Sequence, residues 1–222
     1  MRAILKQLVM NSTMFGVLVL GTLVAGGWQV AWAAIGANSC KGVNSCQGAN
    51  ISVAEQSCNG ANSCNGNNIT VGSLSCNAEG ACNGNNNMIG QVACNGENAC
   101  SGTGNTIGDV SCDNGVDLCT GDNNIIGLGS CNNGNKLCNG KGNTISPASC
   151  NNGNKLCNGK GNTIGLGSCT DGNDLCRGDN NTIGKTSCKN GNKLCNGNKN
   201  TIGDNFCIFA SKLCNGNNQF IR

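Results

Sequence analysis

The chain has 222 residues, among them 20 cysteines, 36 glycines and one proline, and it contains no histidine and no tyrosine. Arg2 and Lys6 are two of the 14 basic side chains, which leaves 12 bases against 11 acids from Ala34 onward. This near-neutral balance argues against a nucleic-acid partner, because such binders present a net basic face. Without histidine or acid pairs at consistent spacing there is no basis for general acid–base catalysis, so we expect no enzyme and no cofactor.

Residues 1–33 have the pattern of a secretory signal peptide. A basic start precedes an apolar stretch over 14–25, and an A-x-A cleavage sequence ends at Ala33. We expect cleavage between Ala33 and Ala34, which leaves a mature chain of residues 34–222, either secreted or kept in the periplasm or at the cell surface. A retained membrane anchor is the alternative. No further apolar run follows, so we expect no stable membrane insertion after cleavage.

The cysteines follow a fixed schedule through the rest of the chain. Their sequence separations alternate between 6 and 12 up to Cys112 and between 7 and 12 after it, which gives ten repeats whose length is first 18 and then 19. So short a period is typical of a solenoid, in which each repeat forms one coil that stacks on the last. The 20 positions are Cys40, Cys46, Cys58, Cys64, Cys76, Cys82, Cys94, Cys100, Cys112, Cys119, Cys131, Cys138, Cys150, Cys157, Cys169, Cys176, Cys188, Cys195, Cys207 and Cys214.

An exported chain this rich in cysteine is expected to hold disulfides rather than free thiols. Zinc sites typically combine C-x2-C pairs with histidine, whereas the close pairs here are C-x5-C or C-x6-C, so we expect no metal site. The favoured pairing joins the two cysteines of one coil across its interior. Pairing between stacked coils, which lie ~4.8 Å apart, remains open as the alternative.

Each coil contains three short segments, centred on the first cysteine, the second cysteine and a Val or Ile, and each segment is followed by glycine. Because glycine accepts positive φ at little cost, these glycines predict three corners and three short strands per coil. The expected fold class is therefore all-β: a single triangular β-helix, or β-solenoid, of ten coils stapled by intracoil disulfides. The extra residue of the later coils is expected at the first corner, between the two cysteines.

Further side chains are expected to fill the interior beside the cysteines. Alternation along the strands places an aliphatic column, a leucine column and an asparagine ladder inside, and it places the Ser and Asn that flank the first cysteine outside. The aliphatic column is Val71, Ile89, Ile107, Ile126, Ile145, Ile164, Ile183, Ile202 and Ile221; the leucine column is Leu118, Leu137, Leu156, Leu175, Leu194 and Leu213; the asparagine ladder is Asn87, Asn105, Asn124, Asn143, Asn162, Asn181 and Asn200.

Three outward columns are candidate binding surfaces. The first is a threonine column beside the aliphatics, the second is the Ser-Cys-Asn side, and the third is a charged column that we interpret as serving coil register and solubility. The threonine column is Thr70, Thr106, Thr144, Thr163, Thr182 and Thr201; the second side includes Ser75 with Asn77, Ser130 with Asn132 and Ser149 with Asn151; the charged column is Asp117, Lys136, Lys155, Asp174, Lys193 and Lys212.

The C-x5-C pairs from Cys40 to Cys100, flanked by outward hydroxyls, resemble those of the disulfide-stapled β-solenoid antifreeze proteins of beetles. Those proteins use a flat Thr-Cys-Thr face to order water, so the resemblance implies ice as a ligand of the threonine column. This chain departs from them in its longer period, in Ser-Cys-Asn replacing Thr-Cys-Thr, and in the interruptions at Met88 and Ile125. The repeat also resembles uncharacterised secreted microbial Cys-rich repeat proteins, which implies the fold and no activity.

Charge is unevenly distributed along the expected rod. Residues 34–135 hold one base and seven acids, and residues 136–222 hold eleven bases and four acids, so local net charge runs from −6 to +7. The mature chain would start in repeat phase, without an expected N-terminal cap, and Phe206, Phe209 and Phe220 fall in the last coil. We therefore predict a structural scaffold that associates head to tail with itself or binds extracellular surface polymers. Ice binding is the alternative.

Overall fold

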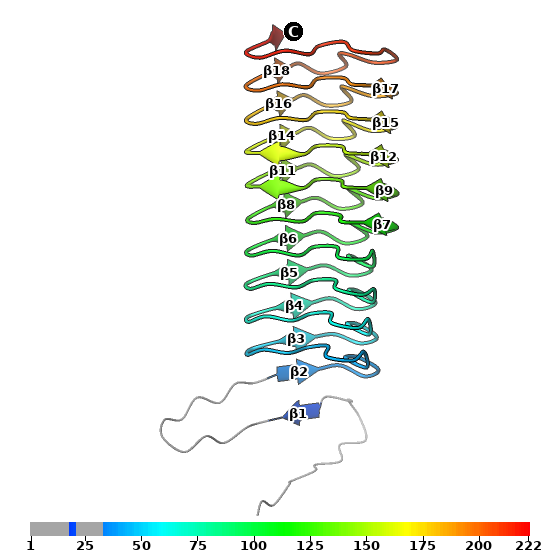
Figure 1. Ribbon diagram of the computed structural model, residues 1–222, viewed down its shortest axis with the longest axis vertical. Coiled ribbons are helices and arrows are strands. Elements are labelled where there is room, and N and C mark those ends of the chain that lie inside the picture. Colours follow the sequence, from blue (N-terminus) through cyan, green and yellow to red (C-terminus); the bar gives the residue numbers. More distant parts are fainter. Residues whose placement is uncertain (1–17, 21–32) are drawn as a thin grey trace, which may run out of the picture.

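The computed structural model describes residues 18–20 and 33–222 and shows a straight rod of stacked coils (Figure 1). Throughout these residues the regular structure consists of short β-strands and turns, which confirms the expected all-β solenoid. The predicted signal peptide lies outside the described residues, apart from one short strand and Ala33.

One parallel sheet runs the length of the rod. Each of the ten coils contributes one short strand, and β2 precedes the first disulfide. Equivalent residues stand in register, as where Thr144 lies opposite Thr163 and Ile145 opposite Ile164. From the first coil to the last, its strands are β2 (Ala33–Ile35), β3 (Ser52–Val53), β4 (Thr70–Val71), β5 (Met88–Ile89), β6 (Thr106–Ile107), β8 (Ile125–Ile126), β11 (Thr144–Ile145), β14 (Thr163–Ile164), β16 (Thr182–Ile183), β18 (Thr201–Ile202) and β19 (Phe220–Ile221).

The outer edge of this main sheet is paired at the N-terminal end. Strand β1 (Leu18–Leu20) runs antiparallel to β2, with Val19 opposite Ala34. Since β1 lies within the predicted signal peptide, the expected cleavage would remove it and leave the edge of β2 open.

The later coils carry additional strands at and after the first corner. The extra residue of these coils lies there, as expected, and widens the turn enough for a second stack of strands, which Figure 1 shows beside the C-terminal half of the rod. The stack is β7 (Gly115–Val116), β9 (Gly134–Asn135), β12 (Gly153–Asn154), β15 (Gly172–Asn173) and β17 (Gly191–Asn192), and a separate pair is β10 (Gly140–Lys141) with β13 (Gly159–Lys160).

The cysteine segments are not strands, contrary to the expectation from sequence. All 20 cysteines have φ between 53° and 60°, in the left-handed region. A left-handed residue interrupts the alternation of an extended strand, so the residue before each first cysteine points inward together with it. The serines at this position were expected to face solvent, and they are fully buried instead: Ser57, Ser75, Ser111, Ser130, Ser149, Ser168 and Ser187.

Every coil is closed by a disulfide between its own two cysteines, which establishes the intracoil connectivity. Their Cα–Cα distances of 5.8 to 6.3 Å are ordinary for disulfides. The pairs are Cys40–Cys46, Cys58–Cys64, Cys76–Cys82, Cys94–Cys100, Cys112–Cys119, Cys131–Cys138, Cys150–Cys157, Cys169–Cys176, Cys188–Cys195 and Cys207–Cys214.

The expected aliphatic columns fill the rest of the apolar interior. The aliphatic column from Val71 to Ile202 and the leucine column from Leu118 to Leu194 are buried. Ile221 is only partly buried and Leu213 is 49 % exposed, unlike the other members of their columns. Both residues lie in the last coil, which no further coil covers in the structure.

Two polar ladders complete the interior. The Asn143 Nδ2 donates to the carbonyl of Gly159 at 2.9 Å, and its Oδ1 accepts from the Asn162 N–H at 3.0 Å, which confirms the predicted asparagine ladder. The Ser149 Oγ donates to the Gly165 carbonyl at 2.8 Å. In the described part of the chain, every buried side-chain nitrogen or oxygen has a hydrogen-bond partner. Stacking is therefore directed by hydrogen bonds as well as by apolar burial.

Candidate functional site

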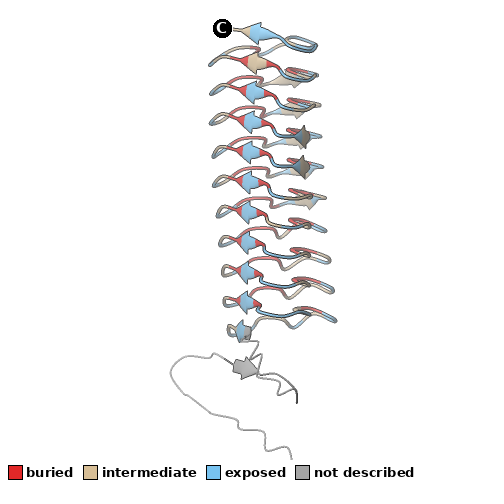
Figure 2. Cartoon of the chain, turned by 90° about the vertical axis from the view of Figure 1, so that its left-hand side faces the viewer, coloured by how far each residue is buried: buried red, intermediate tan, exposed pale blue. Residues whose placement is uncertain are grey.

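The threonine column lies on the main sheet and faces solvent. In the main-sheet strands from β3 to β16, the first residue is exposed and the second is buried, because the two point to opposite sides of the sheet. Figure 2 shows these exposed strands stacked along one side of the rod. The expected residues Thr70, Thr106, Thr144, Thr163 and Thr182 are exposed, and Thr201 is partly exposed.

Parallel in-register pairing spaces these hydroxyls by ~4.8 Å along the rod. The column is single, because the residues two positions away are a corner residue such as Asn68 or Gly161 on one side and a small residue such as Gly165 on the other. Met88 and Ile125 occupy the same column and are 59 % and 55 % exposed. The surface is thus a flat strip of mixed hydroxyl and apolar character.

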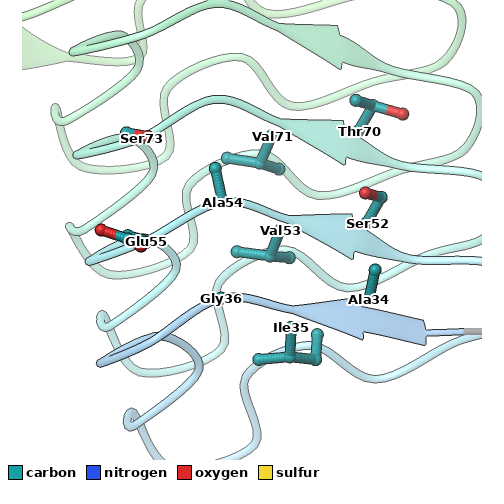
Figure 3. Close-up of a pocket in the computed structure, with 10 residues that line it drawn as sticks. All are labelled: Ala34, Ile35, Gly36, Ser52, Val53, Ala54, Glu55, Thr70, Val71 and Ser73. Carbon is teal, nitrogen blue, oxygen red and sulfur yellow. The ribbon is translucent and has the colours of Figure 1, made fainter. Parts of the chain in front are cut away.

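A shallow depression lies at the N-terminal end of this strip (Figure 3). Ser52 and Thr70 lie along the strands, whereas Glu55 and Ser73 lie on the turn that follows, so the polar groups do not converge on one point. This depression was not predicted from the sequence. The sequence feature that could have indicated it is Ala34, a small residue in the first strand at the position where later strands have threonine.

The Ser-Cys-Asn side is not a free binding surface. Its serines are buried, and its asparagines are hydrogen-bonded to the backbone of neighbouring coils. The Asn132 Nδ2 donates to the Val110 carbonyl at 2.7 Å, and its Oδ1 accepts from the Asp113 N–H at 2.8 Å. These side chains therefore hold the coils together. Asp113 occupies the same column, and burial raises the pKa of its carboxyl.

The charged column does not link the coils through ion pairs. Between residues 33 and 222 the structure contains one ion pair, in which Arg177 Nη1 lies 3.0 Å from Asp174 Oδ1 of the same coil. Asp117 and Lys136, neighbours in successive coils, do not pair. The predicted role of these charges in coil register is therefore not supported by ion pairing.

The cysteine sulfurs are not available as metal ligands. Sulfur atoms of adjacent disulfides approach within 4.8 Å, as for Cys112, Cys119 and Cys131, but a disulfide sulfur is not a thiolate. All 20 cysteines are paired in this way. In the described ranges there is also no helix with the length and apolar character needed to cross a membrane.

These features define a disulfide-stapled parallel β-solenoid with one flat, threonine-bearing side. The chain belongs to the family described as Domain of unknown function (DUF7640), whose model matches residues 27–136 and 79–174. The two matches overlap, as happens when one model aligns to a tandem repeat in two registers. No curated protein and no solved structure matches the chain.

Proposed function

We propose that this protein is a secreted, non-enzymatic structural rod that assembles end to end outside the cell. The observation that carries the proposal is the uniformity of the coils. Each coil repeats one disulfide and the same polar ladders. The recurring side chains of the repeat therefore serve to close each coil and to stack it on the next. Such a chain gains length and stiffness with every coil.

Export is supported by the disulfides. All 20 cysteines are paired, and proteins with this many disulfides are typical of oxidising compartments. The N-terminal sequence supplies a matching signal peptide. The resemblance to secreted microbial Cys-rich repeat proteins points the same way.

End-to-end assembly is supported by the last coil and by the charge distribution. Phe209, Leu213 and Phe220 are 81 %, 49 % and 64 % exposed, so the last coil carries three exposed apolar side chains. Signal cleavage would free the edge of β2 at the other end, where Val43 is 73 % exposed. Opposite local charges of −6 and +7 favour encounters between unlike ends.

Sedimentation velocity on the oxidised mature chain tests this assembly. We expect elongated oligomers that grow as salt is lowered, because the Debye length rises from ~8 Å at 0.15 M to ~30 Å at 0.01 M. Phe209→Asn together with Phe220→Thr copies residues found at these positions in other coils and should abolish the oligomers. Met88→Thr, on the main sheet, is the matched control. A rod that stays monomeric at high concentration and low salt would contradict the assembly.

Ice binding is the second candidate function, favoured by the flat in-register threonine column. If the column binds ice, Thr163→Leu with Thr182→Leu should reduce thermal hysteresis and inhibition of ice recrystallisation while the fold survives, because both side chains are exposed. Thr103→Leu, an exposed threonine outside the main sheet, should leave both activities unchanged. A wild-type protein without either activity would exclude this function.

A further inference from the structure

An exposed apolar ridge follows the corner at which the chain leaves the main sheet. We number the strands β2 to β19 of that sheet as rungs 1 to 11. After rungs 3 to 8, the two corner residues include one large apolar side chain, and the polar corners of rungs 1, 2, 9 and 10 flank this stretch. The ridge consists of Leu74, Val92, Val110, Leu128, Pro147 and Leu166, all of them exposed.

Three ridge residues occupy backbone positions that are unfavourable for them. Leu74, Val92 and Val110 have φ values of 59°, 52° and 55°. Asn38 and Asn205 fill the same corner position in rungs 1 and 10, and asparagine tolerates this conformation far better than a β-branched residue does. Thr186 of rung 9 occupies the same position with φ of 52°, so the left-handed conformation belongs to the repeat. The ridge differs from the other corners because its side chains are apolar and exposed.

The corner is also held rigidly. The Leu74 N–H donates to the Glu55 carbonyl at 3.1 Å, and the Leu74 carbonyl accepts from Asn95 Nδ2 at 3.0 Å. The Val110 carbonyl accepts from Asn132 Nδ2 at 2.7 Å. The ridge is therefore ordered before any partner binds, which lowers the entropic cost of association.

The position of the ridge makes it complementary to itself. Its midpoint lies between Val110 of rung 5 and Leu128 of rung 6, halfway between the polar corners at its two ends. A two-fold axis through this point places the ridges of two copies against each other. Rung 5 of one copy then lies beside rung 6 of the other, rung 3 beside rung 8, and in general rung k beside rung 11 − k. Such a self-matching patch is what a two-fold dimer interface requires.

We propose that the apolar ridge is the interface of an antiparallel, side-by-side dimer of this chain. Val110 then lies beside Leu128 of the second copy, and Leu74 beside Leu166 of the second copy. Glu55 of rung 2 faces Lys185 of rung 9, and both side chains are exposed. The acidic half of each rod, with a local charge of −6, lies along the basic half of the other, with +7.

Charge selects the antiparallel arrangement over the parallel one. In a parallel pair Glu55 would face Glu55, Lys185 would face Lys185, and like-charged halves would lie together, which is repulsive. Because the ridge is only one or two side chains wide, the interface belongs to the weak class below ~1,200 Å². The dimer goes beyond the end-to-end assembly proposed above and does not depend on it.

Sedimentation equilibrium on the oxidised mature chain, over a wide concentration range, measures this dimer. Leu74→Asn, Val92→Asn and Val110→Asn combined should weaken dimerisation at least tenfold. Asparagine suits the left-handed positions, so the variant should keep the wild-type circular dichroism and melting temperature. Val116→Asn removes an exposed valine at another corner, where the next coil carries Asn135, and should leave the dimer intact.

Charge reversal tests the antiparallel register. Glu55→Lys and Lys185→Glu should each weaken the wild-type dimer, and the double variant should restore it. Mixing the two single variants should give heterodimers that are stronger than either homodimer, because both charge pairs are then attractive.

Small-angle scattering separates this dimer from end-to-end assembly. The side-by-side dimer keeps about the length of one rod, whereas end-to-end pairs double it. Doubled particles that respond to Phe209→Asn and ignore the ridge variants would overturn the dimer and support the end-to-end function. A wild-type chain that is monomeric at every concentration would overturn both. Short dimers without charge rescue would overturn the antiparallel register.

Discussion

At the scale of single residues, the fold depends on amides that each make two hydrogen bonds to the backbone of the preceding coil. In the column after the first cysteine, the Asn95 Oδ1 and its equivalents accept a backbone N–H while Nδ2 donates to a carbonyl, as in the 3.0 Å bond from Asn95 to Leu74. Asp113 interrupts this column. Its Oδ1 accepts from the Asn95 N–H at 2.8 Å, but an ionised carboxylate has no hydrogen to donate.

We predict that Asp113→Asn stabilises the rod at neutral pH by about 1 kcal/mol, the usual gain from one hydrogen bond. Burial raises the pKa of Asp113 above its ordinary value of 3.8. Because the pKa of Asp113 is higher in the folded state, the protonated carboxyl contributes stability to the fold at pH values below 3.8. This contribution is lost as the pH rises through the folded-state pKa. The variant's advantage in melting temperature should therefore shrink as the pH is lowered, and an advantage that is independent of pH would contradict this explanation.

At the scale of the coil, corner glycines differ in what they are needed for. A Cβ at Gly140, where φ is 139°, would overlap the carbonyl oxygen of Gly159 in the next coil. A Cβ at Gly142, where φ is 66°, would meet no atom within 4 Å. The first glycine allows the coils to stack closely, and the second only relieves backbone strain.

Two alanine substitutions should separate these roles. Gly142→Ala should cost ~1–2 kcal/mol, the penalty for a left-handed residue with a side chain. Gly142→Asn should recover most of this loss, since Asn123 and Asn180 occupy the same position in other coils. Gly140→Ala should cost ~3 kcal/mol or more, because backbone must move in two coils. Thermal melting of the oxidised proteins gives the order, and equal losses at the two glycines would contradict it.

The sequence predicted the stacked columns well, because the regular cysteine period already determines which residues lie above one another. It correctly predicted that Thr163 points outward and Ile164 inward, because both lie on a strand. It failed at Ser75 and Ser149, because alternation does not hold beside a left-handed cysteine. The threonine column could therefore be predicted, whereas the serine ladder and the apolar ridge depend on corner geometry that composition does not reveal.

At the scale of the whole molecule, stability is distributed along the rod. Each coil contacts its neighbours on both sides, so the two end coils have half of the contacts of a central coil. Burial follows this arrangement: cysteines from Cys58 to Cys195 are fully buried, whereas Cys40, Cys46 and Cys214 are partly exposed. Opening is therefore expected to start at the ends and move inward.

Reduction should follow the same order. Each disulfide closes a loop with a sequence separation of 6 or 7, which stabilises a coil by ~2.5 kcal/mol in the chain-entropy model. Under native conditions, we expect reductant to open Cys40–Cys46 and Cys207–Cys214 first, since a thiolate must reach the sulfur and only the end coils expose theirs. Alkylation at timed intervals followed by peptide mapping gives the order in which the disulfides are reduced.

The central pairs should follow only as the β circular dichroism is lost. Simultaneous reduction of all ten pairs would contradict opening from the ends. A fully reduced chain that keeps its circular dichroism and melting temperature would show that the hydrogen-bonded ladders hold the rod without disulfides.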